Sequence, residues 1–444
     1  MRTKTKTMIL LLVLALVALP AFIGCAKTAT TPIPTATPFA SVTPAPTLTA
    51  SPTLTTSSTP MPQLYPGGTV TIGQFYASLY AGGATYDGLK DYIQYFNSQG
   101  GAYGVTVKVA AYDTGGQAQE ASAGYTALKG EGAVLMVATS LQDATGSASQ
   151  ASKDKLPEII DQPSEDLLYP PGYVWSTGLT DGQGIASYLH WIAEQGWDWQ
   201  GKGRPPRFML WFVDVKMATD MEKIGQAIAN NLGITWCDPQ VYPFPFPADW
   251  TPYVQRMKQE KPDYVFGLIV QLLAAHDSTG IPKDPNAKYC AMSTSSGEVA
   301  ADYGQEAVGI QELYQLAGFD EPGIPGVKLM TQMHTANKRS TDGTYEYQYA
   351  RGFDLGMEAC ELLRIAVADD GYPVTPEAVA RAIYKLDFDA MGMTTRLKFP
   401  QDSRLGGTKF RIAVVTQTLQ AAFLTDWKEA VPLGETLKAA GMTQ

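Results

Sequence analysis

From residue 67 onwards, short apolar runs alternate with longer stretches in which apolar residues recur at helical spacing. Up to residue 160 the pattern predicts strands over 69–72, 105–109, 133–138 and a short one ending at Ile160, with helices over 84–97, 117–129 and 144–155. Strand–helix–strand units of this length are typical of a mostly parallel, doubly wound sheet. The pattern therefore predicts an α/β fold.

The same alternation restarts after a break at residues 177–184. The second series consists of helices over 184–195, 218–232 and 251–260 and strands over 208–213, 234–241, 264–269 and 289–292. The late elements are helices over 345–368 and 376–386 and strands over 395–399 and 410–416. They do not begin a third domain of their own, so we interpret the chain as two α/β lobes to which these late elements return.

The N-terminus has the pattern of an export signal. Arg2, Lys4 and Lys6 precede an apolar run over residues 8–23, which is shorter than the ~20 residues that a membrane-spanning helix needs. Phe-Ile-Gly-Cys at 22–25 resembles a bacterial lipobox, with Phe22 in place of the usual Leu. We therefore predict a signal peptide over 1–24 and a lipid anchor on Cys25. Two acyl chains on this cysteine would attach the protein stably to the membrane. The alternative is a plain secretory signal followed by an incidental cysteine.

Residues 25–66 differ in composition from the rest of the chain. After Cys25 the segment consists mainly of Thr, Pro, Ser and Ala, and Lys27 is its only charged residue. It has too little apolar surface to offset the entropy of ordering, so the sequence predicts a disordered linker. We interpret it as a spacer, glycosylated or not, in preference to a ligand for a partner domain.

Charge and composition exclude several classes of function. The chain has 444 residues with 33 Lys and Arg against 43 Asp and Glu, and no basic run that nucleic acid binding requires. Its three His share no metal-ligand spacing, and the sequence has no Gly-x-Ser-x-Gly motif. We expect no metal, no cofactor and no catalytic residue. Two of Cys237, Cys290 and Cys360 could pair outside the cell, and the sequence does not select which.

Several short segments, taken in their order and spacing, resemble the type I periplasmic binding proteins of the branched-chain amino-acid (Leu/Ile/Val) group. They are Thr-Ile-Gly at 71–73, Phe-Asn-Ser-Gln-Gly-Gly at 96–101, Ala-Tyr-Asp at 111–113, the Gln-Ala repeat at 117–120, Tyr-Val-Trp-Ser-Thr at 173–177, the helix start at 181–184 and the segment 397–406. This resemblance covers residues 68–427. It implies two doubly wound, Rossmann-like lobes joined by a three-strand hinge, which close over a small ligand.

The resemblance also implies the domain limits and the partners. Lobe 1 is expected over 67–180 and 314–393, and lobe 2 over 181–313 and 394–444. The chain would be a monomeric, lipid-anchored solute-binding subunit outside the cytoplasm, with an ABC transporter permease as its partner. The ligand class that the resemblance implies is an amino acid or a related small carboxylate or amide.

Candidate polar contacts follow strands, because ligands of open parallel sheets bind beyond the carboxyl ends of the strands. Thr139 and Ser140 come after the strand 133–138 and before a helix, whose N-terminus favours a carboxylate. The resemblance places a carboxylate-binding Ser in this loop as well. Ser164 follows the next strand. Ser164 is a further candidate for contact with the ligand, whereas Thr139 and Ser140 are expected either to bind it or to cap the helix.

Acidic and aromatic candidates complete the predicted site. Asp214 and Glu298 follow strands of the second lobe and are candidates for an ammonium group, or else solvated loop charges. The first loop, 74–83, departs from the Gly-Pro-Leu-Thr-Gly-like run of the family. The residues predicted there and nearby as ligand contacts or walls are Phe75, Tyr76, Ser78, Tyr80 and Trp175. For the aromatic ones the alternative is packing in the core. The apolar loop 242–250 is expected to pack within its lobe, or else to rim the cleft or meet the transporter.

Two other functions stay open at this level. A sensor on the same fold would pass occupancy to a signalling partner, and a neighbouring permease gene would argue against it. A secreted hydrolase would need a nucleophile–base pair, for which three His offer little material.

Overall fold

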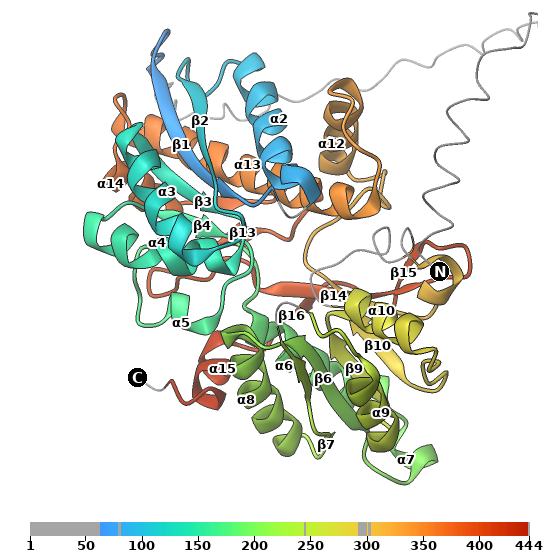
Figure 1. Ribbon diagram of the computed structural model, residues 1–444. Coiled ribbons are helices and arrows are strands. Elements are labelled where there is room, and N and C mark those ends of the chain that lie inside the picture. Colours follow the sequence, from blue (N-terminus) through green and yellow to red (C-terminus); the bar gives the residue numbers. More distant parts are fainter. Residues whose placement is uncertain (1–62, 79–80, 244–245, 292–299, 301–302, 443–444) are drawn as a thin grey trace, which may run out of the picture. The chain divides into compact units, whose positions relative to one another are not determined.

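The computed structural model describes residues 63–78, 81–243, 246–291, 300 and 303–442 (Figure 1). The predicted signal peptide, Cys25 and nearly all of the linker lie outside these residues. Within the described part of the chain, no helix is both long enough and apolar enough to cross a membrane.

The first lobe is built on a five-stranded parallel sheet with the order β2-β1-β3-β4-β5. Its strands are β1 (Thr69–Tyr76), β2 (Thr106–Asp113), β3 (Ala133–Ala138), β4 (Glu158–Ile160) and β5 (Val174–Ser176). Its helices are α2 (Ala84–Ser98), α3 (Ala118–Gly130), α4 (Leu141–Asp154), α5 (Glu165–Leu168), α12 (Pro325–Ala336), α13 (Gly343–Asp370) and α14 (Pro376–Ile383). Alternate residues of β3 pack on opposite faces: Leu135 and Val137 meet α2 and α13, whereas Met136 meets α3 and α4.

The late helix α13 belongs to the first lobe because it packs closely on α2. A Cβ on Gly352 would lie 1.9 Å from the carbonyl oxygen of Thr85, and one on Gly88 would lie 2.1 Å from that of Tyr349. Only glycine permits this approach of two helix backbones. The crossing fixes α13, and with it the polar residues that the helix directs at the end of the sheet.

The second lobe contains a mixed sheet, in which the parallel order β11-β10-β9-β6-β7 is extended by antiparallel β14 and β15. Its strands are β6 (Arg207–Val213), β7 (Thr235–Trp236), β8 (Gln240–Tyr242), β9 (Tyr264–Gly267), β10 (Lys288–Ala291), β11 (Gln311–Tyr314), β14 (Lys409–Val415), β15 (Ala421–Phe423) and β16 (Lys428–Glu429). Its helices are α6 (Asp181–Trp191), α7 (Trp199–Lys202), α8 (Lys216–Asn231), α9 (Thr251–Glu260), α10 (Ile269–Thr279) and α15 (Leu433–Ala439). A two-stranded ribbon of β12 (Asp387–Phe388) and β13 (Leu397–Lys398) lies outside both sheets.

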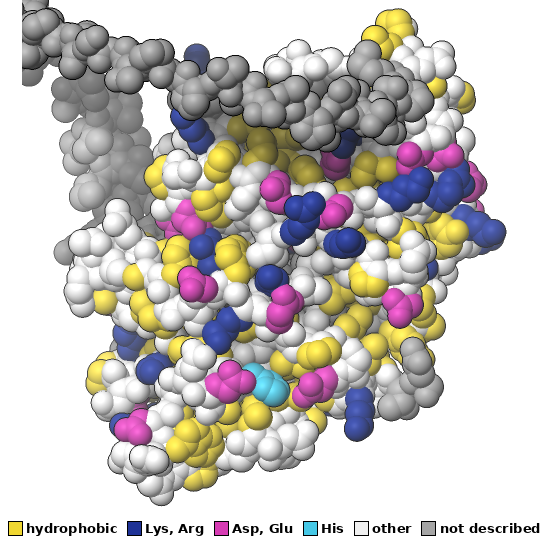
Figure 2. Space-filling view, turned by 180° about the vertical axis from the view of Figure 1, so that it is seen from behind, with side chains coloured by type: hydrophobic (Ala, Val, Ile, Leu, Met, Phe, Trp, Pro, Cys, Tyr) yellow, Lys and Arg dark blue, Asp and Glu magenta, His cyan; other side chains and the backbone are white. Residues whose placement is uncertain are grey.

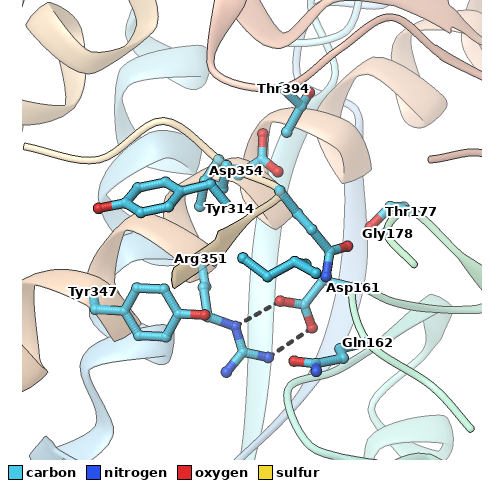
Figure 3. A pocket seen from close by; sticks show the side chains of 12 residues that line it. Asp161, Gln162, Thr177, Gly178, Tyr314, Tyr347, Arg351, Asp354 and Thr394 are labelled. Atoms are coloured by element: carbon cyan, nitrogen blue, oxygen red, sulfur yellow. Dashed lines mark hydrogen bonds and ion pairs between the residues drawn. The ribbon is translucent and has the colours of Figure 1, made fainter. Parts of the chain in front are cut away.

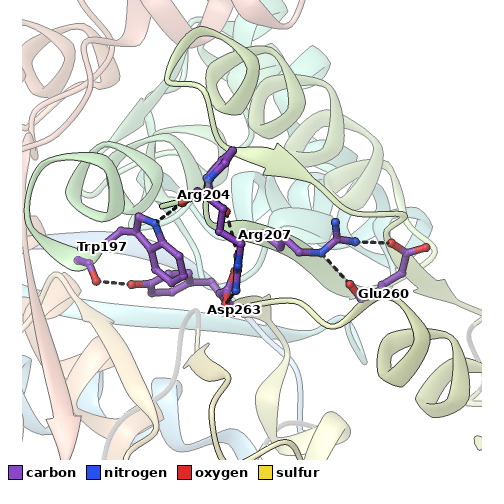
Figure 4. Close-up of polar contacts among 8 residues, drawn as sticks. Trp197, Arg204, Arg207, Glu260 and Asp263 are labelled. Carbon is purple, nitrogen blue, oxygen red and sulfur yellow. Dashed lines mark hydrogen bonds and ion pairs between the residues drawn. The ribbon is translucent and has the colours of Figure 1, made fainter. Parts of the chain in front are cut away.

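Charged pairs hold the start of β6 and of β9 together (Figure 4). Arg204 forms two hydrogen bonds of 2.7 Å with the carboxylate of Asp263, and Arg207 reaches Glu260 at 3.0 Å. The indole of Trp197 donates to the carbonyl oxygen of Arg204 at 2.9 Å. These contacts lie at the amino ends of the strands, which leaves the carboxyl ends to form the site.

Three chain segments cross between the lobes, after β5, after β11 and before β14. They are joined directly: Ser176 N donates to the carbonyl oxygen of Arg404 at 2.7 Å, and Leu179 N donates to Oε1 of Gln315 at 2.6 Å. A Cβ on Gly407 would lie 2.1 Å from the carbonyl oxygen of Thr177. The three-segment hinge is therefore tightly packed.

The structure differs from the predicted elements in several places. The strand expected over 234–241 is divided into β7 and β8, because Pro239 between them has no N–H for the ladder. The strand expected over 264–269 ends at Gly267, and the apolar residues beyond it begin the unpredicted helix α10. Helix α12 was also not predicted. Leu397 and Phe399, which the predicted limit at residue 393 assigns to the second lobe, pack in the core of the first.

Candidate functional site

A cavity of about 220 Å³, here called the cleft cavity, lies between the carboxyl ends of β3, β4 and β6. The first lobe contributes Thr139, Ser140, Leu141, Gln142, Gln162, Gln348 and Arg351, and the second contributes Phe212, Met217 and Leu268. Apolar side chains thus face a wall of hydroxyl and amide groups. Such a mixture of apolar surface and a few polar groups is typical of small-molecule sites.

The N-terminus of α4 opens on the cleft cavity. Ser140 is its N-cap residue and accepts a hydrogen bond from Asp143 N at 3.2 Å. The hydroxyl of Thr139 donates to the carbonyl oxygen of Phe75 at 3.1 Å, which ties β3 to β1. The partial positive charge of this helix end favours a ligand carboxylate.

Asp143 lies in the first turn of α4 and is fully buried. Its carboxylate accepts a hydrogen bond of 2.7 Å from Thr114, and burial raises its pKa. A negative charge on Asp143 would compete with a ligand anion for the partial positive charge at this helix end. The carboxylate of Asp143 makes its hydrogen bond to a protein group, and the residue that lines the cavity is the cap residue Ser140.

Arg351 of α13 lines the cleft cavity at a place here called its floor, and Figure 3 shows its guanidinium beside Asp161. Its guanidinium makes two hydrogen bonds to the carboxylate of Asp161, of 2.6 and 2.8 Å, and a third to Oε1 of Gln348 at 3.0 Å. A longer contact of 3.4 Å reaches the carbonyl oxygen of Thr139. The positive charge at the floor is therefore balanced by Asp161.

A second cavity of about 60 Å³, here called the hinge cavity, adjoins the first and shares Gln162 and Arg351 with it. Asp354 and Thr394 line this cavity, together with the hinge residues Gly178 and Gln315 (Figure 3). Burial first, and then the neighbouring Asp161, raise the pKa of Asp354. The hinge cavity thus has an acidic lining group whose charged form is disfavoured by its surroundings.

Of the residues predicted from the sequence, Thr139 and Ser140 line the cleft cavity. Ser164 instead occupies the N-cap position of α5, where its hydroxyl donates to the carboxylate of Asp166 and makes no capping hydrogen bond to the backbone. Asp214 follows β6 as predicted, but it is exposed and does not line either cavity. Glu298 and Tyr80 lie outside the described residues.

The predicted aromatic residues that the structure describes, Phe75, Tyr76 and Trp175, do not line either cavity. Phe75 and Trp175 are buried in the first lobe, where the indole of Trp175 donates to the hydroxyl of Tyr384 at 3.4 Å. Tyr76 stacks on Tyr86 with ring centroids 5.2 Å apart. Ser78 is exposed, and its N–H donates to Asp113. For Phe75 and Trp175 the structure thus corresponds to the alternative of core packing.

The site also contains polar residues that were not predicted, among them Asp161, Gln162, Gln348 and Arg351. The first two follow a strand of three residues, whose end is difficult to locate from sequence. The other two come from α13, far along the chain. The available signal was the pair of charges Arg351 and Asp354, which alternate with the apolar residues Ala350, Phe353 and Leu355.

No group of three or more His, Cys, Asp or Glu residues in the described part of the chain is arranged to hold a metal ion. Two of the histidines have structural contacts: His276 Nδ1 lies 2.7 Å from the carbonyl oxygen of Ile281, and His334 Nε2 lies 2.8 Å from that of Ser340. On the face shown in Figure 2, Lys and Arg side chains are mixed with Asp and Glu. That face offers no continuous basic patch for a polyanion.

Two α/β lobes, three crossing segments and an interlobe cavity at the strand ends define a protein of the type I periplasmic binding fold. The family model for periplasmic binding proteins matches residues 75–426, and the chain belongs to this family. The predicted resemblance and fold class are therefore confirmed. No protein with a curated description matches the sequence.

This chain matches solved structures of the same fold over nearly the whole length of those structures. A branched-chain amino acid ABC transporter protein from Thermus thermophilus, with bound valine, has a TM-score of 0.72 and 16% identity over 84% of this chain and 99% of that one. A fatty acid ABC transporter substrate-binding protein from Thermomonospora curvata has a TM-score of 0.66 and 17% identity, over 84% and 96%. A solute-binding protein from R. palustris in complex with 4-hydroxybenzoate has a TM-score of 0.67 and 15% identity, over 83% and 100%. Proteins of this fold thus accept ligands of different chemistry.

Proposed function

We propose that this protein is the lipid-anchored, extracytoplasmic substrate-binding subunit of an ABC importer. It captures a small carboxylate, most simply an amino acid or a related amide, in the cleft cavity. The observation that carries the proposal is the composition of that cavity. Ser140 at the N-terminus of α4 lies on one side, and Phe212 and Leu268 of the other lobe lie opposite.

The cavity supports a ligand with one polar end and one apolar side. At about 220 Å³ it is below the range of about 300–1,000 Å³ for drug-sized ligands. Ser140, Gln162 and Gln348 offer neutral hydrogen-bonding groups to the polar end. Because both lobes line the cavity, a ligand that contacts both walls stabilises their closed arrangement. Closure would signal occupancy to the permease.

The binding test uses the chain from residue 25 onwards with Cys25→Ser, which stays soluble. A thermal-shift screen would include amino acids, aromatic acids, amides, sugars and nucleosides. A ligand at ~100 times its Kd should stabilise the fold by ~2.7 kcal/mol, a shift of a few degrees. We expect a response to amino acids, acids or amides that Ser140→Ala weakens. Exposed Ser78→Ala is the matched control and should leave the shift unchanged.

Two results would contradict the proposed function. A response only to sugars or nucleosides would show that the ligand class is wrong. A carboxylate ligand that Ser140→Ala and wild type bind equally would show that the α4 end is not the anion site.

Anchoring and partnership need separate measurements. Full-length chain should fractionate with membranes and incorporate radiolabelled palmitate, and Cys25→Ser should abolish both. Uptake of the identified ligand should require the co-expressed permease. Binding without uptake would favour the alternative of a surface sensor on the same fold.

A further inference from the structure

The hinge cavity contains polar groups that the protein itself does not satisfy. Oδ1 of Asp354 and Oγ1 of Thr394 are both buried, and neither has a hydrogen-bond partner among the described residues. Asp354 is only 6% exposed. A buried polar group without a partner costs about 1–3 kcal/mol, so two in one cavity indicate a missing partner.

When Asp354 is ionised its Oδ1 atom can only accept, and the hydroxyl of Thr394 can accept as well. The guanidinium of Arg351 is directed at Asp161, and the Oε1 atom of Gln315 already accepts from Leu179 N. The group that fits beside Asp354 and Thr394 therefore supplies several N–H donors. An ammonium group has three donors and no acceptor.

The size of the hinge cavity limits what it can hold. At about 60 Å³ it has room for a few waters or one small head group, but not for a whole amino acid. The backbone is closely packed at its wall, where a Cβ on Gly178 would lie 2.1 Å from the carbonyl oxygen of Asp161. It meets the cleft cavity at Gln162 and Arg351, so a ligand held in the larger cavity can extend one end into the smaller.

Resting on the proposed function, we propose that the hinge cavity is a subsite for a positively charged nitrogen of the ligand, with Asp354 as its counter-ion and Thr394 as a second acceptor. The ligand is then a molecule with a carboxylate or amide end at α4 and an ammonium end at α13. Such a ligand contacts residues beside the hinge, and its charge is met by an acid that is otherwise buried without a partner.

Electrostatics give this subsite a distinctive dependence on pH. The charged groups around Asp354 are Asp161 and Arg351 at the cavity wall and Glu358 one turn along α13, whose own pKa is raised by burial and then by Asp354. Asp181 at the start of α6 is a further buried acid near Asp161, and its pKa is raised as well. Since burial and Asp161 raise the pKa of Asp354, an ammonium group must bind as this acid loses its proton. Affinity for an amine should therefore rise as the pH increases.

The experiment compares ligands that differ by one ammonium group: valine with isovalerate, γ-aminobutyrate with butyrate, and lysine with norleucine. Calorimetry on the Cys25→Ser chain measures Kd at about pH 6 and about pH 8. We expect the amine of at least one pair to bind about tenfold tighter than its partner, to tighten with pH and to lose this advantage in Asp354→Asn. Asp370→Asn, an exposed residue at the end of the same helix that lines neither cavity, is the control and should keep it.

Three results would overturn the inference. Equal affinity of each amine and its partner for wild type would do so, as would an amine preference that Asp354→Asn retains together with its pH dependence. An Asp354-dependent stabilisation by ammonium or potassium chloride alone, without competition from the organic amines, would assign the cavity to a free ion. If no member of any pair binds wild type, the proposed function fails for this ligand class, and the inference fails with it. If Asp354→Asn does not fold, Thr394→Val provides the same comparison.

Discussion

The guanidinium of Arg351 meets the carboxylate of Asp161 edge to edge, with two hydrogen bonds of 2.6 and 2.8 Å (Figure 3). The two residues come from the end of β4 and from α13, which are far apart in the sequence. Their side chains are 13% and 21% exposed, so the pair is only partly hydrated. The pair joins α13 to the end of β4 and so holds Arg351 in its place at the cleft cavity.

Removal of Arg351 should destabilise the fold more than removal of a surface arginine. Arg351→Met leaves the carboxylate of Asp161 without its partner in a largely buried place. Breaking a buried pair costs about 3–5 kcal/mol, and partial exposure should reduce the loss to about 2–3 kcal/mol. The free energy of unfolding in urea measures it. The double variant Asp161→Asn/Arg351→Met should recover part of the loss.

The matched control is Arg396→Met, which breaks the pair of Arg396 with Asp387. The side chain of Arg396 is 67% exposed, and exposed pairs contribute about 0–1 kcal/mol. Equal losses in the two variants would show that the Arg351–Asp161 pair contributes no more than an ordinary surface contact.

Glu158 should make the stability of the protein depend on pH. This residue of β4 is fully buried, and burial raises the pKa of its carboxyl from 4.5 to about 8. Both carboxyl oxygens contact the hydroxyl of Ser147, which itself donates to the carbonyl oxygen of Asp143 at 2.9 Å. Ser147 can then accept from a protonated Glu158, so the neutral acid satisfies the geometry.

The sign of the effect follows from proton binding. The folded chain holds the proton of Glu158 more tightly than the unfolded chain does, so this stabilisation is fully present below the unfolded pKa. It is lost as the pH rises through about 8. Glu158→Gln, which keeps the shape without the charge, should be the more stable protein at high pH, by on the order of a few kcal/mol. Exposed Glu131→Gln should leave the pH profile of unfolding unchanged. A wild-type profile that is flat between the two pKa values would contradict this expectation.

A methyl group on Gly407 should disturb the hinge. Its Cβ would lie 2.1 Å from the carbonyl oxygen of Thr177 and 2.9 Å from Cα of Gly178, so two crossing segments must move apart. We expect Gly407→Ala to lower the melting temperature. Gly184→Ala is the control, because a Cβ in this helix position meets no atom within 4 Å. That change should stabilise the protein, since alanine favours a helix interior over glycine by about 0.5–1 kcal/mol. A neutral Gly407→Ala would show that the hinge is loosely packed.

The general fold could be predicted because its strands and helices are strongly periodic. Strand β3 was predicted with its observed ends, and the residues that follow it, Thr139 and Ser140, were placed correctly beside a helix N-terminus. Local patterns carry this information, because an apolar run followed by a capping residue marks the end of a strand and the start of a helix.

The rest of the site depends on contacts that no local pattern contains. Arg351 meets the carbonyl oxygen of Thr139 across 212 residues of sequence, and this meeting requires the glycine-mediated crossing of α13 and α2. Trp175 shows a second limit. It was predicted as a wall of the site, yet its indole packs on Arg404 and Tyr384. Successive strand residues point to opposite faces, and sequence alone does not say which face meets the ligand.

The three cysteines of the described chain should remain free thiols in the native protein. Cys237, Cys290 and Cys360 are all unpaired and buried. Burial raises the pKa of Cys237 to about 11 and those of Cys290 and Cys360 well above the usual range, so the reactive thiolate is scarce. With the Cys25→Ser chain, a chromogenic disulfide reagent should detect almost no thiol under native conditions and all three after unfolding in guanidinium without reductant. The single variant Cys237→Ser should lose one of these thiols and keep its fold. Only one reactive thiol in the unfolded wild type would reveal a disulfide and contradict the structure.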